Sequence, residues 1–125
     1  MLTTIGDPGA PREVRIVWTQ EGATAYLPMS EDPGPDLRLD YSGESRELVL
    51  DAICDRIATS APSALIGLLA GNTVEIATRL GVTRISVSRW RHGRATMGKL
   101  RREKVMQALG ISKVNNLWVL TQKNS

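Results

Sequence analysis

Residues 73–92 constrain the fold of this chain more than any other stretch. Small or aliphatic side chains recur there at helical spacing on both sides of a glycine, Gly81. Glycine adopts the left-handed conformation without a steric penalty, so it can end one helix and let the chain turn into the next. The positions expected to pack the two helices together are Val74, Ile76, Ala77, Leu80, Val82, Val87 and Trp90. The stretch therefore predicts two short helices joined by a tight turn.

The residues that precede the two predicted helices are typical helix caps. Asn72 stands before the first helix with Glu75 three residues later, which is the spacing of a capping box. Thr83 stands in the same position before the second helix. With the apolar positions assigned to the core, the second helix directs a largely polar and basic set outward. This set is Arg84, Ile85, Ser86, Ser88, Arg89, Arg91 and His92.

This arrangement resembles the helix-turn-helix of Cro/repressor-type proteins, the lambda-repressor-like (Xre-type) family. Residues 87–94 resemble that family's exit from the recognition helix. Residues 100–111 resemble its next helix, which ends in a Leu-Gly-aliphatic signature. The resemblance covers residues 61–112 and implies a helical DNA-binding domain.

We therefore expect a mainly α fold, in which a lambda-repressor-like helical domain occupies residues 45–112. An acidic, β-rich extension is expected over residues 1–44, and a tail with a possible dimer contact over residues 113–125. The helical domain is expected to begin with a helix from Ser45 to Ala58, followed by a second helix that Pro62 opens.

Within the extension, the Gly/Pro-rich residues 1–12 are expected to be mobile. Residues 14–19 and 23–27 predict a β-hairpin, and the alternating residues 37–41 predict a third short strand. The tail segment 114–120 is compatible with a short helix or with a strand.

The two halves of the chain carry opposite charges. Residues 1–60 hold five arginines and no lysine against eleven carboxylates, a net charge of −6. Residues 61–125 hold eleven lysines and arginines against two glutamates, a net charge of +9. A basic half that contains a helix-turn-helix is the electrostatic signature of a polyanion binder. The acidic half is expected to lie away from the DNA, to bind a protein partner, or to screen the basic half.

The resemblance assigns roles to individual residues around the second helix. Base reading is expected from Arg84, Ile85 and Arg89, with Thr83, Ser86 and Ser88 beside them. Arginine can donate two hydrogen bonds to guanine, and isoleucine suits a thymine methyl group. Core packing remains an alternative for Ile85, and base stacking an alternative for Trp90. Phosphate contacts are expected from Asn72, Thr73, Arg91, His92, Arg94, Lys99, Arg101 and Arg102.

Composition argues against several other classes of protein. One cysteine and one histidine cannot form a zinc finger or an internal disulfide. We find no phosphate loop and no catalytic pairing, so we expect no enzyme activity, no cofactor and no metal. No apolar run reaches the roughly 18 residues of a membrane span, and no signal peptide is evident. A cytoplasmic, nucleoid-associated protein without a membrane partner is expected.

The sequence thus predicts a transcriptional regulator that binds double-stranded DNA, in the style of a phage or bacterial repressor. Proteins of this family usually act as homodimers on paired half-sites, and activation is as compatible with these residues as repression. Dimer contacts are expected at Leu117, Trp118 and Leu120, or in the N-terminal hairpin. Two alternatives remain open. One is an antitoxin whose acidic half binds a protein toxin while its basic half represses its own operon. The other is a DNA-targeting subunit of a recombination or packaging machine.

Overall fold

The expectation of a mainly α fold is wrong, because the chain folds as a mixed α/β protein. A computed structural model describes residues 1–28, 35–43 and 45–121. It is 39% helical and 25% strand, with a four-stranded antiparallel sheet and a separate two-stranded sheet. The sequence patterns predicted too few strands near both ends of the chain. The short segments there form strands because they pair with neighbouring segments.

The N-terminal sheet has the strand order β1-β2-β3-β4. Its strands are β1 (Leu2–Ile5), β2 (Val14–Trp18), β3 (Gly22–Leu27) and β4 (Leu37–Ser42). The predicted hairpin and third strand are confirmed as β2, β3 and β4. The prediction that residues 1–12 are mobile is wrong for β1, whose residues pair with β2 and whose Ile5 is 2% exposed. Buried and exposed residues alternate along β2, so the sheet has one apolar face and one solvent face.

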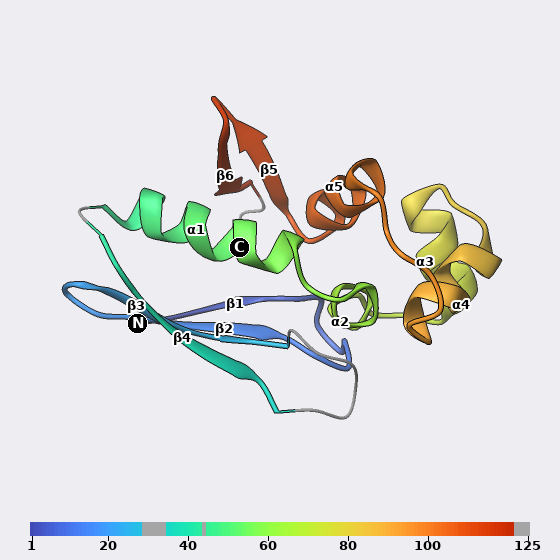
Figure 1. Cartoon of the computed structure of the whole chain (residues 1–125), viewed down its shortest axis with the longest axis horizontal. Helices are drawn as coiled ribbons and strands as arrows, with labels where there is room; N and C mark the ends of the chain where they lie inside the picture. Colours follow the sequence, from blue (N-terminus) through green and yellow to red (C-terminus); the bar gives the residue numbers. More distant parts are fainter. Residues whose placement is uncertain (29–34, 44, 122–125) are drawn as a thin grey trace.

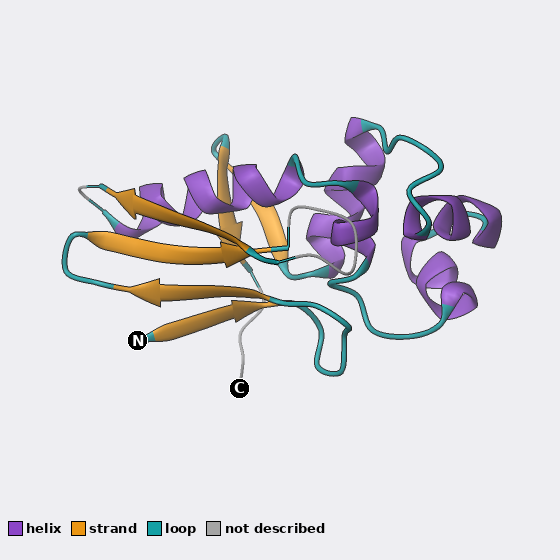
Figure 2. Cartoon of the chain, turned by 60° about the horizontal axis from the view of Figure 1, so that its bottom comes forward, coloured by secondary structure: helices purple, strands orange, loops and turns teal. Residues whose placement is uncertain are grey.

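The described residues that follow the sheet form five helices. They are α1 (Arg46–Ala58), α2 (Pro62–Ile66), α3 (Thr73–Leu80), α4 (Arg84–Arg91) and α5 (Lys99–Ala108). Helix α1 runs along the apolar face of the sheet, and the α3–α4 pair lies at the far end of the molecule (Figures 1 and 2). The helix expected from Ser45 to Ala58 is present as α1, with Ser45 as its cap, since the Ser45 hydroxyl accepts from the Leu48 amide at 3.2 Å. Helix α1 thus covers the sheet, whereas α3 and α4 lie beyond one end of it.

The chain ends in a hairpin of β5 (Ile111–Val114) and β6 (Leu117–Leu120), which settles the choice between helix and strand for this segment. Its two-residue turn is Asn115-Asn116, with φ values of 52° and 65°. Asparagine tolerates this left-handed region better than most residues, and two such residues suit a tight hairpin turn. The hairpin packs on α1, where the Trp118 amide donates to Asp51 Oδ1 at 2.7 Å. Trp118 is therefore a core residue of its own chain, 6% exposed.

A single hydrophobic core joins the sheet, the helices and the hairpin. Residues from all three expected parts of the chain (1–44, 45–112 and 113–125) contribute to this core. The acidic N-terminal part therefore packs directly against the helices. Asp7, in the β1–β2 connection, reinforces this junction. Its carboxylate accepts from the Ala70 amide at 2.9 Å and forms a two-bond ion pair with Arg79 of α3. The sheet is thereby tied to α3, the helix that precedes α4.

Candidate nucleic-acid interface

The α3–α4 pair has the local geometry that the sequence predicted. Gly81 adopts the left-handed conformation with φ of 67°, and the Val82 amide donates to the Ala77 carbonyl at 3.0 Å. The capping box is complete: Asn72 Oδ1 accepts from the Glu75 amide, and Glu75 Oε1 accepts from the Asn72 amide, each at 2.9 Å. The angle between the two helices is therefore fixed by backbone bonds and by close packing.

The core assignment of this pair is confirmed except at one position. The buried positions are Ile76, Ala77, Leu80, Val87 and Trp90, with Val82 partly buried against them. The assignment of Val74 to the core is wrong, since its side chain is 54% exposed. Trp90 lies in the core, and its indole N–H donates to the Thr96 carbonyl at 3.2 Å, so it has no free face for base stacking.

Helix α4 exposes a short row of side chains along its outer surface. Arg84, Ile85 and Arg89 are all exposed, and Ile85 keeps 61% of its surface accessible to solvent. Core packing of Ile85 is therefore excluded within this chain. Thr83 caps the helix by accepting from the Ser86 amide at 3.2 Å, and its hydroxyl lies 3.1 Å from that of Ser86. Thr83 and Ser86 thus support the helix start, while Ser88 is half-buried beside Arg89.

Several of the expected phosphate-contact residues gather where α4 ends beside the start of α3. The Arg91 guanidinium donates to Thr73 Oγ1 at 3.0 Å and to the Gly71 carbonyl at 3.4 Å. His92 is exposed, and its Nδ1 lies 2.8 Å from the Ser88 carbonyl oxygen. Because the Asn72 side chain and amide are both used by the capping box, Asn72 acts here as a helix cap. Thr73 and Arg91 form a fixed pair of polar groups at the start of α3.

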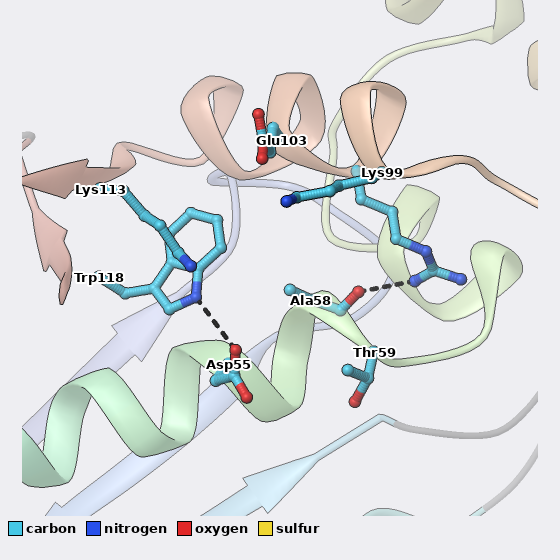
Figure 3. A pocket seen from close by; sticks show the side chains of 8 residues that line it. Asp55, Ala58, Thr59, Lys99, Glu103, Lys113 and Trp118 are labelled. Atoms are coloured by element: carbon cyan, nitrogen blue, oxygen red, sulfur yellow. Dashed lines mark hydrogen bonds between the residues drawn. The ribbon is translucent and has the colours of Figure 1, made fainter. Parts of the chain in front are cut away.

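The other expected phosphate residues follow α4 in the chain and lie in two different environments. Arg94 and Arg101 are exposed, as a phosphate contact requires. Lys99 is also exposed, but its side chain extends toward Trp118, into a cavity of about 360 Å³ between α1, α5 and the hairpin (Figure 3). Asp55 and Glu103 line the same cavity, so Lys99 faces carboxylates. Arg94 and Arg101 are the stronger candidates of the three.

Arg102 points into the protein and binds its backbone. Its guanidinium and Nε donate to the carbonyls of Met97, Ala58 and Ser60 at 3.0, 2.8 and 2.7 Å, and Figure 3 shows the bond that Ala58 accepts. Burial lowers the pKa of Arg102 below its usual value. Ala58 ends α1, Ser60 lies in the loop after it, and Met97 lies just before α5, so Arg102 joins α1 to α5.

We expect Arg102→Ala to destabilise the protein by about 2 kcal/mol, because three carbonyls lose a charged donor in a partly buried site. Urea unfolding followed by circular dichroism measures the change. Arg101→Ala is the matched control, since Arg101 is the exposed neighbour on the same helix and should change stability by less than about 0.5 kcal/mol. Equal effects of the two substitutions would contradict the structural role of Arg102.

Sequence reasoning missed the long-range contacts that hold this surface in place. Arg79 joins Asp7 across 72 positions of the chain and also donates to the Ala108 carbonyl at 2.6 Å. Lys104 of α5 donates to the Leu80 carbonyl at the end of α3, at 3.3 Å. No local pattern marks these residues, because each bond depends on two segments meeting in the folded chain. Together they fix α3 against the sheet and α5.

The described residues include side chains of the metal-ligating types and the single cysteine of the chain. Among them, no group of three or more histidine, cysteine or carboxylate side chains is placed to hold a metal ion. Cys54 is fully buried, and burial together with the nearby Asp51 raises its pKa to about 12. A thiol with such a pKa is protonated at neutral pH and is a poor nucleophile. No helix in the described part of the chain has the length and apolar character needed to cross a membrane.

No protein-family model, no curated protein and no solved structure matches the chain.

Proposed function

We propose that this protein is a sequence-specific regulator of transcription that binds double-stranded DNA through α4. The observation that carries the proposal is the exposed row Arg84, Ile85 and Arg89 on a short helix. Capping and packing position this helix rigidly at one end of the molecule. Ile85 lies between the two arginines and is 61% exposed, so it does not contribute to the core of this chain. It suits a surface that closes on a partner containing both apolar groups and hydrogen-bond acceptors.

The major groove of DNA is such a partner. Each guanine presents two acceptors that an arginine can bind together, and each thymine presents a methyl group. With α4 in the groove, Arg84 and Arg89 would bind guanines and Ile85 would contact a thymine methyl. The fixed pair of Thr73 and Arg91 would meet the DNA backbone beside the groove, joined by Arg94 and Arg101. The resemblance to the Cro/repressor-type helix-turn-helix family supports the same docking.

One recognition helix reads only a few base pairs, so we propose that the protein acts as a homodimer on two half-sites. Two-fold dimers of this kind bind half-sites about one helical turn apart. Trp118 is buried within its own chain, so the apolar side chains that the tail exposes for a dimer contact are Leu120, at 38% exposure, and Val114, at 50%. Bound across a promoter, such a dimer would block transcription by steric exclusion.

Binding to DNA is tested directly by fluorescence anisotropy with a labelled random-sequence duplex at increasing salt concentration. We expect the duplex to bind more tightly than a single strand of the same length. The logarithm of affinity should fall with the logarithm of salt concentration with a slope of about −3 per chain, from Arg91, Arg94 and Arg101. A duplex affinity that is negligible at low salt would contradict the proposal.

A further inference from the structure

A second cleft lies next to the α4 surface and includes a residue from the N-terminal part of the chain. It has a volume of about 420 Å³ and is bounded by the β1–β2 connection, by α2 and by the end of α4. Figure 1 shows that connection passing beside α2, close to the α3–α4 pair. The residues that line it include Arg12, Ser63, Gly67, Arg91 and His92. Of these, Arg91 and His92 also belong to the expected phosphate contacts of α4.

We propose that this cleft holds a phosphate group of the DNA backbone, so that Arg12 extends the DNA-binding surface into the N-terminal part of the protein. The inference rests on the proposed DNA binding and names a contact outside the helix-turn-helix. The cleft would recognise a phosphate group. That group could also come from a free phosphate ion, which is the alternative to the DNA backbone.

The position of Arg12 is fixed before any ligand binds. Its amide donates to the Gly67 carbonyl at 3.0 Å, and its side chain is only 9% exposed. The stem of that side chain lies across Gly67, where a Cβ atom would come within 3.2 Å of Arg12 Cδ. An arginine held in this way loses little conformational entropy when it binds an anion.

The charges of the cleft favour a phosphate. Arg12 and Arg91 are permanent cations, and Arg12 forms an ion pair with Asp36 at 3.7 Å. A phosphate oxygen is a charged acceptor of the same kind, so it can compete with the Asp36 carboxylate for the Arg12 guanidinium. Asp36 should therefore oppose binding of the phosphate.

An unsatisfied hydroxyl group points to the same ligand. Ser63 Oγ is buried, and the described part of the chain provides no hydrogen-bond partner for it. Buried hydroxyl groups normally have a partner, since leaving one without costs about 1–3 kcal/mol. Because Ser63 also lines the cleft, a phosphate group bound there would lie close to this hydroxyl and could act as its acceptor after a small shift of the side chain.

The cleft opens beside the proposed recognition surface. His92 follows Ile85 and Ser88 by seven and four residues, so these three residues lie on one side of α4. Arg91 is bonded to Thr73 at the start of α3. DNA lying along this side of α4 would thus bring its backbone past Thr73 and Arg91 and then past the cleft.

The test measures how tightly the full chain binds a labelled random-sequence duplex. Three variants are compared, and a different result is expected for each. Arg12→Ala should weaken binding about tenfold and reduce the salt slope by about 0.9, the change expected for one lost phosphate contact. Asp36→Asn should strengthen binding about threefold, because it removes the competing carboxylate. Arg15→Ala is the control: it removes the same charge from the sheet, where Arg15 stacks on Tyr26, and should leave the slope unchanged.

The two sources of phosphate are separated by a second measurement, the melting temperature of each variant with and without inorganic phosphate at constant ionic strength. If Arg12→Ala binds the duplex as the wild type does, the inference is overturned. In that case, a phosphate-dependent rise in melting temperature that Arg12→Ala abolishes would assign the cleft to free phosphate. A gain of affinity in Asp36→Asn cannot arise from misfolding, so this variant tests the inference even where Arg12→Ala is unstable. A wild-type protein that does not bind the duplex would instead overturn the proposed function itself.

Discussion

Replacing Arg89 with alanine is expected to remove most of the protein's preference for its preferred site while leaving weaker, general DNA binding in place. Arg89 is exposed on α4, and a pair of bonds from arginine to guanine contributes roughly 1–3 kcal/mol of discrimination. Affinity for the preferred site should therefore fall about tenfold to hundredfold. Affinity for unrelated duplexes should fall much less, since the phosphate contacts remain. Competition binding with the preferred and an unrelated duplex measures both quantities.

The same substitution at Arg56 is the matched control for this prediction. Arg56 is an exposed arginine on α1, a helix that packs on the sheet, so Arg56→Ala removes one positive charge at a distance from α4. It should change both affinities equally and slightly. If Arg89→Ala behaved like Arg56→Ala, the assignment of the α4 row to base reading would be wrong.

Asp7→Ala should destabilise the whole protein by about 3 kcal/mol. The substitution removes the acceptor of the Ala70 amide and the ion-pair partner of Arg79, in a site where the Asp7 side chain is 16% exposed. Urea unfolding should show one transition shifted to lower concentration, because the sheet and helices share one core. Asp40→Ala is the control. Its ion pair with Arg38 is exposed on both sides and should contribute less than about 1 kcal/mol.

The contribution of Asp7 should also depend on pH in a defined direction. Burial raises the pKa of Asp7, but the bonds from Arg79 and the Ala70 amide, with the charge of Arg79, outweigh it and lower the pKa below its ordinary value. A group whose pKa is lowered by folding stabilises the protein fully above its unfolded pKa of about 4. This stabilisation is lost as the pH falls through the lower pKa of the folded state. The difference between wild type and Asp7→Ala should thus be constant near neutral pH and shrink below about pH 4.

The α3–α4 pair could be predicted from sequence because its determinants are local. The capping box of Asn72 and Glu75, the left-handed Gly81 and the apolar spacing all act within a few residues. Each signal points to the same structure, and agreement of this kind makes a sequence pattern informative. Only the assignment of Val74 to the core was wrong. Helical spacing alone does not show which side of α3 is covered by a neighbouring element.

The parts that sequence analysis missed depend on contacts between distant segments. Strand β1 is defined by pairing with β2, and the Gly/Pro-rich connection after it obscured the signal. The β5–β6 hairpin was recognisable from the Asn115-Asn116 turn, but its four-residue strands are too short for a periodicity. In the sequence, Arg102 cannot be distinguished from its exposed neighbours. Its partner Ala58 lies at the end of α1, more than forty residues earlier, so the contact is evident only in the folded chain. The missed strand β1 and the undecided β5–β6 segment led to the wrong fold class.

The central claim, that α4 reads a DNA sequence, is tested most directly by selection from a pool of random duplexes. The wild-type protein, incubated with the pool at moderate salt, should enrich a short motif that contains guanines. If the protein binds as a homodimer, the motif should recur as an inverted repeat about one helical turn apart. The double variant Arg84→Ala, Arg89→Ala should recover DNA without that motif. Recovery of no common motif by the wild type, or of the same motif by the double variant, would contradict the account.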